Sequence, residues 1–259
     1  MRTPIRCLLI LTAAAVVWKP AVLVTAQSQD VRSLLAEARM ALGGVATRAA
    51  ISSFKITGRV SGRNRLETGS FEIICVLPDK FVQIELRAII SPGELVAEPS
   101  YGPSVEHRTT RLGFNSGDLI FQPHVNRTDA RTQNFPVTPA QLRQAWRLAR
   151  AGFASLSLAL FAESFAGVPL QFSAAAGPGA EASLQVTGPD VAGTLTFNRQ
   201  TRLPEAFGRM RYDDYRDVGG RRIPFRITNG LDVWTVRAFL VNVKVGDKVF
   251  KPTHPAAGY

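Results

Sequence analysis

The chain contains few of the side chains that metal and redox chemistry require. Two cysteines and three histidines occur among its 259 residues. The histidines, His107, His124 and His254, are far apart and form no HxH or HxxxH pair, so we expect neither a zinc site nor a cofactor. Cys7 lies in an N-terminal segment that we expect to be removed, which leaves Cys75 without a disulfide partner. The apolar neighbours of Cys75 predict that it is a small buried hydrophobe.

Sequence motifs of common enzyme classes are also missing. The chain has no GxSxG motif and no phosphate-binding loop, although residues distant in sequence can still assemble a Ser-His-Asp triad. An acidic cluster contains Asp213, Asp214 and Asp217, whose carboxylate oxygens are of the kind that bind cations. We favour instead its pairing with nearby Arg216, Arg221 and Arg222 on a solvated hairpin. We therefore assign no catalytic residue and expect a protein that is not an enzyme.

The N-terminus has the pattern of a secretory signal peptide. Arg2 and Arg6 precede an apolar run over residues 7–18, and the small residues around Ala26 suit signal peptidase. This run is shorter than the roughly 20 residues of a membrane span. We predict a signal peptide over residues 1–26 and a periplasmic rather than an extracellular protein. A retained membrane anchor is the alternative.

Acidic residues are outnumbered by basic ones, 20 to 31, which gives a formal net charge of +11. Loss of residues 1–26 would lower this charge to +8. A positive balance favours anionic lipid head groups, acidic proteins or nucleic acid. Because the arginines are scattered rather than clustered with aromatic residues, we expect a solvated basic surface and no nucleic-acid site. Transient contact with a membrane surface is compatible with this charge.

Two helices are expected in the chain. Asp30 as N-cap and the apolar stripe over residues 31–45 predict the first helix, and the glycines at 43–44 end it. Thr138, followed by proline and a capping-box glutamine, predicts the start of the second. Its segment 151–162 is apolar on nearly every side, which favours burial in the core. A movable plug or a segment that touches a membrane is the alternative.

The rest of the chain has the pattern of antiparallel strands, because apolar residues alternate and turn signals recur about every 10 residues. No strand–helix repeat occurs, so a parallel α/β fold is not expected. We predict a mainly β, α+β fold in one domain, residues 27–259, with loops over 91–110 and 123–137. The expected strands cover residues 54–60, 66–76, 81–90, 111–115, 118–122, 170–174, 182–187, 193–198, 203–212, 221–228 and 233–245.

Several short motifs follow one another in a characteristic order. They are Pro78-Asp79-Lys80-Phe81, Gly113-Phe114-Asn115, Leu203-Pro204-Glu205, Asp214-Tyr215-Arg216-Asp217-Val218-Gly219-Gly220, Ile223-Pro224 and a closing Val249-Phe250-Lys251-Pro252. Their order resembles that of the periplasmic carriers and receptors of outer-membrane lipoproteins, a superfamily that also includes a stress-response sensor. The resemblance is closest to uncharacterised members, and the segment 91–110 departs from the carriers, so specificity for lipoproteins stays open.

The resemblance implies a strongly curved antiparallel sheet that forms an incomplete barrel, with helices covering its concave face. It also implies that the hollow accepts acyl chains, which a wide, apolar, curved sheet suits physically. The predicted lining is apolar and comes from three strands and the second helix: Phe54, Ile56, Phe71, Ile73, Val82, Ile84, Leu86, Phe153, Leu156 and Leu160. A register error of one residue would move each strand residue to the other face.

Two functions follow from these expectations. The first is a monomeric, non-enzymatic periplasmic protein that binds a lipid or an acylated protein and carries it toward the outer membrane. The second is an interaction or stress-sensor module, in which the protein's own side chains fill the interior and its loops bind another envelope protein.

Overall fold

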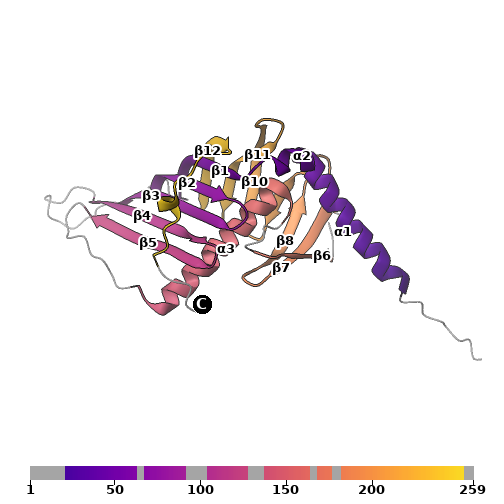
Figure 1. Ribbon diagram of the computed structural model, residues 1–259, viewed down its shortest axis with the longest axis horizontal. Coiled ribbons are helices and arrows are strands. Elements are labelled where there is room, and N and C mark those ends of the chain that lie inside the picture. Colours follow the sequence, from indigo (N-terminus) through magenta and orange to yellow (C-terminus); the bar gives the residue numbers. More distant parts are fainter. Residues whose placement is uncertain are drawn as a thin grey trace, which may run out of the picture.

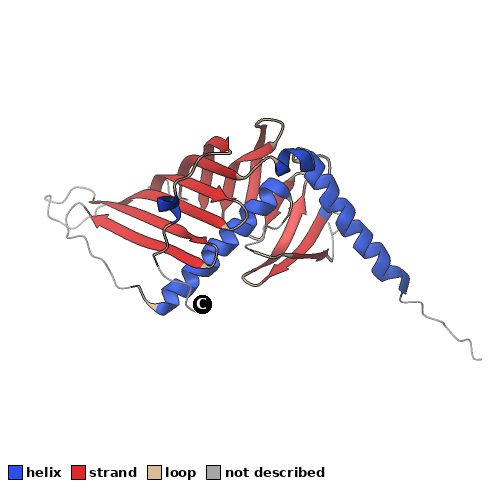
Figure 2. Cartoon of the chain, in the orientation of Figure 1, coloured by secondary structure: helices blue, strands red, loops and turns tan. Residues whose placement is uncertain are grey.

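The computed structural model describes residues 21–62, 67–91, 104–127, 137–163, 168–176 and 182–253. Residues 1–20 of the expected signal peptide lie outside these ranges. The described helices are α1 (Ala21–Ala41), α2 (Gly44–Ala49), α3 (Pro139–Phe161) and the short 3₁₀ helix η2 (Asp247–Phe250). Figure 2 shows that strands make up most of the remaining structure, as the alternating sequence pattern predicts.

The described strands form one antiparallel sheet of twelve strands. In spatial order it runs β5-β4-β3-β2-β1-β12-β11-β10-β9-β8-β7-β6, so two meanders meet where β1 pairs with β12. In the part of the chain described, β5 and β6 are the two edges, and the sheet is not closed. The strands are β1 (Ser53–Ser61), β2 (Glu67–Val76), β3 (Lys80–Ser91), β4 (Ser104–Asn115), β5 (Asp118–Arg127), β6 (Gln171–Ala174), β7 (Ser183–Gly188), β8 (Val191–Phe197), β9 (Pro204–Phe207), β10 (Met210–Asp217), β11 (Arg222–Asn229) and β12 (Asp232–Val241).

Helix α3 links β5 to β6 along the chain and packs on one face of the sheet, which we call the inner face (Figure 1). Its start confirms the predicted capping box. The Thr138 hydroxyl accepts a hydrogen bond from the Gln141 backbone N–H at 3.3 Å, and Gln141 Oε1 accepts one from the Thr138 N–H at 2.8 Å. These bonds satisfy two backbone donors that a helix N-terminus otherwise leaves free.

The main core lies between α3 and the inner face. All α3 residues from Phe153 to Phe161 are buried, which confirms the core burial favoured for this apolar segment. The Phe153 ring lies 5.5 Å from that of Phe81 and 5.2 Å from that of Phe114, so aromatic contacts join α3 to β3 and β4. Phe54 of β1 stacks on Phe239 of β12 at 5.5 Å, where the two meanders join.

A second, smaller apolar cluster lies on the opposite, outer face. It contains Ile74, Val82, Ile120 and Phe250. The chain after β12 returns across this face, and Thr253 Oγ1 accepts a hydrogen bond from the Phe121 N–H at 2.8 Å. The expected last strand, residues 233–245, is therefore shorter than predicted, and the closing motif, residues 249–252, follows it across the outer face. β12 ends at Val241, and η2 covers the outer face of β3 and β4 instead.

Helix α1 differs from its prediction at one end. It already includes Ala21, so Asp30 lies inside the helix rather than at its N-cap. The predicted stop is confirmed, since Gly43 and Gly44 have φ values of 115° and 80°, which glycine adopts without a side-chain clash. The stripe residues Leu34, Leu35, Ala38 and Leu42 are buried in the main core, whereas Val45 is 67% exposed.

One strand prediction and two loop predictions also need correction. The expected strand 203–212 is divided into β9 and β10 by a turn at Gly208, whose φ is 58°. The expected loops 91–110 and 123–137 are shorter, because β4 begins at Ser104 and β5 extends to Arg127; residues 92–103 and 128–136 lie outside the described ranges. The predicted turn at Gly219 and Gly220 is confirmed, with φ values of 62° and 80° between β10 and β11.

Candidate functional site

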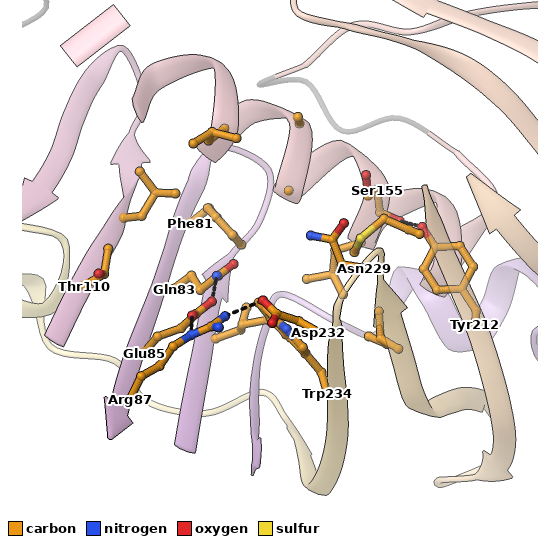
Figure 3. A pocket seen from close by; sticks show the side chains of 18 residues that line it. Phe81, Gln83, Glu85, Arg87, Thr110, Ser155, Tyr212, Asn229, Asp232 and Trp234 are labelled. Atoms are coloured by element: carbon orange, nitrogen blue, oxygen red, sulfur yellow. Dashed lines mark hydrogen bonds and ion pairs between the residues drawn. The ribbon is translucent and has the colours of Figure 1, made fainter. Parts of the chain in front are cut away.

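A cavity of about 420 Å³ lies between α3 and the inner face (Figure 3). Its walls come from β2, β3, β4, β10, β11, β12 and the side of α3 that faces them. The lining residues are Ile73, Phe81, Gln83, Glu85, Arg87, Thr110, Leu112, Leu148, Ala151, Gly152, Ser155, Leu156, Met210, Tyr212, Ile227, Asn229, Asp232 and Trp234.

Small side chains on one stripe of α3 create this cavity. Leu148, Ala151, Gly152 and Ser155 have helical spacings of three and four, so they share one side of the helix and line the cavity together. A Cβ atom at Gly152 would lie 3.8 Å from the Phe81 ring, an ordinary contact distance. The helix therefore comes close to β3 but leaves the neighbouring volume unfilled.

One end of the cavity is apolar. Ile73, Phe81 and Leu112 line it from the sheet, and Leu156 lines it from α3. Tyr212 also lines the cavity and donates a hydrogen bond to the Ser155 backbone carbonyl at 3.1 Å. Burial raises the pKa of Tyr212 well above its ordinary value. The phenol is therefore neutral and serves as a fixed hydrogen-bond donor.

The other end of the cavity is polar and is organised by Arg87 of β3 (Figure 3). Its Nε donates to Glu85 at 2.8 Å, one Nη to Glu67 at 3.0 Å, and the other Nη to Asp232 at 2.7 Å. Burial opposes the charge of Arg87, but the hydrogen bond to Asp232 and the attraction of Glu85 outweigh it, so its pKa is raised. Gln83 donates to the other oxygen of Glu85 and extends this network toward the apolar end.

Seven of the ten predicted lining residues belong to the inner core: Phe54, Ile56, Phe71, Ile73, Phe153, Leu156 and Leu160. Ile73 and Leu156 line the cavity itself. The other five are packed in the surrounding core, where they fill volume rather than border the hollow.

The three predicted residues of β3 lie on the outer face. Val82 is buried in the outer cluster, Ile84 packs against it, and Leu86 is 51% exposed. The inner face of β3 is instead formed by the odd-numbered residues from Phe81 to Arg87. The predicted face of this strand is wrong by one residue, because the returning C-terminal segment gives β3 a second apolar environment.

The polar residues of the cavity were missed by the sequence reasoning. Gln83, Glu85 and Arg87 are not among the predicted lining residues, and Asp232 lies 145 residues from Arg87, so no local pattern links them. The sequence signal for the hollow is the group of small residues Ala151, Gly152 and Ser155 on one side of the helix.

The acidic cluster of β10 lies outside this site. Asp214 accepts a hydrogen bond from Arg216 at 2.6 Å, and this bond lowers the pKa of the Asp214 carboxyl. Asp217 accepts one from the Gly220 N–H at 3.1 Å within the turn. The predicted pairing with arginine is thus confirmed for Asp214. Across the described residues, no group of three histidines, cysteines or acidic residues is placed to hold a metal ion.

Comparison of the chain with protein-family models and with curated proteins finds no match. The resemblance to lipoprotein carriers therefore stays a prediction. Of the helices that the structure describes, none combines the length and apolar character needed to cross a membrane.

Proposed function

We propose that the protein is an exported, non-enzymatic binding protein that holds an acyl chain between α3 and the inner face. The observation that carries this proposal is the cavity of about 420 Å³, one end of which is walled by Ile73, Phe81, Leu112 and Leu156. Small-molecule sites typically have volumes of about 300–1,000 Å³ and mostly apolar walls. Each buried methylene of an acyl chain contributes about 0.8 kcal/mol to binding, so apolar walls alone supply useful affinity.

In this proposal the sheet is a half-barrel and α3 covers its concave face. The contacts of α3 support it, because the helix meets β3, β4 and β5 of one meander and β8, β9 and β11 of the other. Figure 2 likewise shows α3 in front of the sheet, between its two halves. The unpaired edges leave such a half-barrel open on one side.

Substitutions at Gly152 test the proposal. Gly152→Leu projects a large side chain into the cavity and should abolish uptake of a fluorescent fatty acid by the purified protein. Gly152→Ala is the matched control, since its Cβ meets only ordinary contacts and uptake should persist. Organic extraction of the purified wild-type protein followed by mass spectrometry should also recover a bound lipid. Absence of both uptake and extracted lipid would rule out the proposal.

The alternative function is an envelope interaction or sensor module without a carried ligand. The continuous burial from Phe153 to Phe161 favours it, because the protein's own side chains already fill much of the inner face. In that case crosslinking in cells should recover a protein partner, and the purified protein should contain no lipid.

A further inference from the structure

The polar end of the cavity has an arginine whose three nitrogens are already engaged. Arg87 uses Nε and both Nη atoms on three different carboxylates, at distances between 2.7 and 3.0 Å. A guanidinium binds an anionic head group best when its paired N–H groups are available for a bidentate contact. Three of the five N–H groups of Arg87 are thus occupied, and the three carboxylates around it repel a further carboxylate or phosphate.

The charge around Arg87 is negative. Three carboxylates, those of Glu67, Glu85 and Asp232, surround one guanidinium, which leaves a formal charge of −2. Arg108 is the cross-strand neighbour of Arg87 and is exposed. With Arg108 included, the formal charge of the group is −1. The side chains of Arg87 and Glu85 are only 16% and 13% exposed, so water screens this charge less than it screens a surface pair.

The carboxylate of Asp232 has acceptor capacity left at this end of the cavity. Asp232 Oδ2 accepts the hydrogen bond from Arg87, and within the described residues no donor lies within hydrogen-bond distance of Oδ1. Trp234, which lies beside Asp232 in Figure 3, is 7% exposed, and its indole N–H has no acceptor in the described part of the chain. Buried donors without an acceptor are rare in proteins. An oxygen atom of the ligand would supply one.

We propose that the polar end of the cavity selects a single-chain amphiphile whose head group donates hydrogen bonds, an amine or ammonium in preference to a carboxylate or phosphate. The acyl chain then occupies the apolar end beside Phe81 and Leu156, and the head group lies against Glu85 and Asp232. This inference rests on the proposed function, since it names the class of ligand that the same cavity takes.

Three probes with the same alkyl chain test the inference on the purified protein: dodecylamine, dodecanol and dodecanoate. Their dissociation constants are measured at neutral pH and low salt by displacement of a fluorescent apolar probe. We expect dodecylamine to bind at least about tenfold more tightly than dodecanoate, with dodecanol between them, because the partly buried carboxylates attract one charge and repel the other. High salt should reduce this difference.

A matched pair of variants tests whether the preference for an amine over a carboxylate arises in the cavity. Asp232→Asn removes one lining charge and should lower the amine-to-carboxylate affinity ratio at least about threefold. Glu72→Gln makes the same charge change on the outer face, where Glu72 pairs with Lys55 at 2.7 Å, and should leave the ratio unchanged. The wild-type ranking remains decisive if Asp232→Asn does not fold.

The outcomes separate the two proposals. If all three probes bind and dodecanoate binds as tightly as dodecylamine or more tightly, the head-group inference is overturned and the proposed function stands. If none of the probes binds, the proposed function fails, and the inference fails with it.

Discussion

The two halves of α3 differ in composition and in surroundings, because all three arginines of the helix lie in its N-terminal half. In the C-terminal half every residue from Phe153 to Phe161 is buried, whereas the N-terminal half has Leu148 at 52% exposure and Gly152 beside the cavity. Both halves pack on the same sheet. Large side chains such as Phe153, Leu158 and Phe161 pack in the core of the C-terminal half, whereas the cavity borders the helix around Ala151, Gly152 and Ser155, where the two halves meet.

Hydrogen bonds from side chains to backbone carbonyls add to the packing of the C-terminal half. Tyr215 donates to the Pro204 carbonyl at 2.9 Å and lies 3.4 Å from that of Ala159, and Arg221 donates to the Leu160 carbonyl at 3.2 Å. Arg221 also lies 4.7 Å from the centre of the Phe161 ring. The comparison teaches that the buried half fixes α3 to the sheet, so that the other half can border a hollow without loss of the fold.

The largest expected effect is on stability in the packed half. Phe153→Ala removes a fully buried ring between Phe81 and Phe114 and should lower the free energy of unfolding by about 3–5 kcal/mol. Leu148→Ala is the control on the same helix and should change it by less than about 0.5 kcal/mol, because Leu148 is half exposed. Chemical denaturation followed by circular dichroism measures both. Equal losses would contradict the division of α3 into two halves.

An intermediate effect is expected at the two tyrosines that hold α3. Tyr215→Phe leaves the Pro204 carbonyl without its buried donor and should cost about 1–3 kcal/mol of unfolding free energy. Tyr212→Phe removes the bond to the Ser155 carbonyl, which borders the cavity, where water can replace the lost donor. We therefore expect Tyr212→Phe to be the milder change in the same denaturation experiment, and the reverse order would count against an accessible cavity.

The smallest expected effect is a gain in stability. Gly152→Ala should raise the free energy of unfolding by about 0.5–1 kcal/mol, because alanine loses less conformational entropy than glycine in a helix interior. The cavity leaves room for the added methyl group, whose nearest neighbour is the Phe81 ring at 3.8 Å. A loss of stability at this position in thermal denaturation would mean that the hollow beside α3 is more tightly filled than the structure indicates.

Local patterns predicted much of the secondary structure. The capping box at Thr138 and the glycine turns at 43–44 and 219–220 appear where the sequence places them. These features depend on contacts between residues close in sequence, so a short stretch contains the information that specifies them. The alternation of Phe54 and Ile56 likewise predicted their burial on one face of β1.

The candidate site was predicted less well, and β3 shows why. Both of its faces meet protein: α3 and the cavity on one side, and the C-terminal segment with Phe250 on the other. Apolar alternation identifies the buried face of a strand only when the other face meets water. The alternation therefore predicts Val82 and Ile84 in the cavity, whereas the structure places Glu85 and Arg87 there.

The sequence by itself determined the mainly β architecture, the start and the burial of α3, and the turns, because each depends on periodicity or on residues within a few positions of one another. Tertiary structure alone decided which face of β3 borders the cavity and which carboxylates surround Arg87. Asp232 reaches Arg87 across 145 residues of sequence only because β1 pairs with β12 and places the two meanders side by side. Contacts of that kind depend on the whole chain, and no local pattern encodes them.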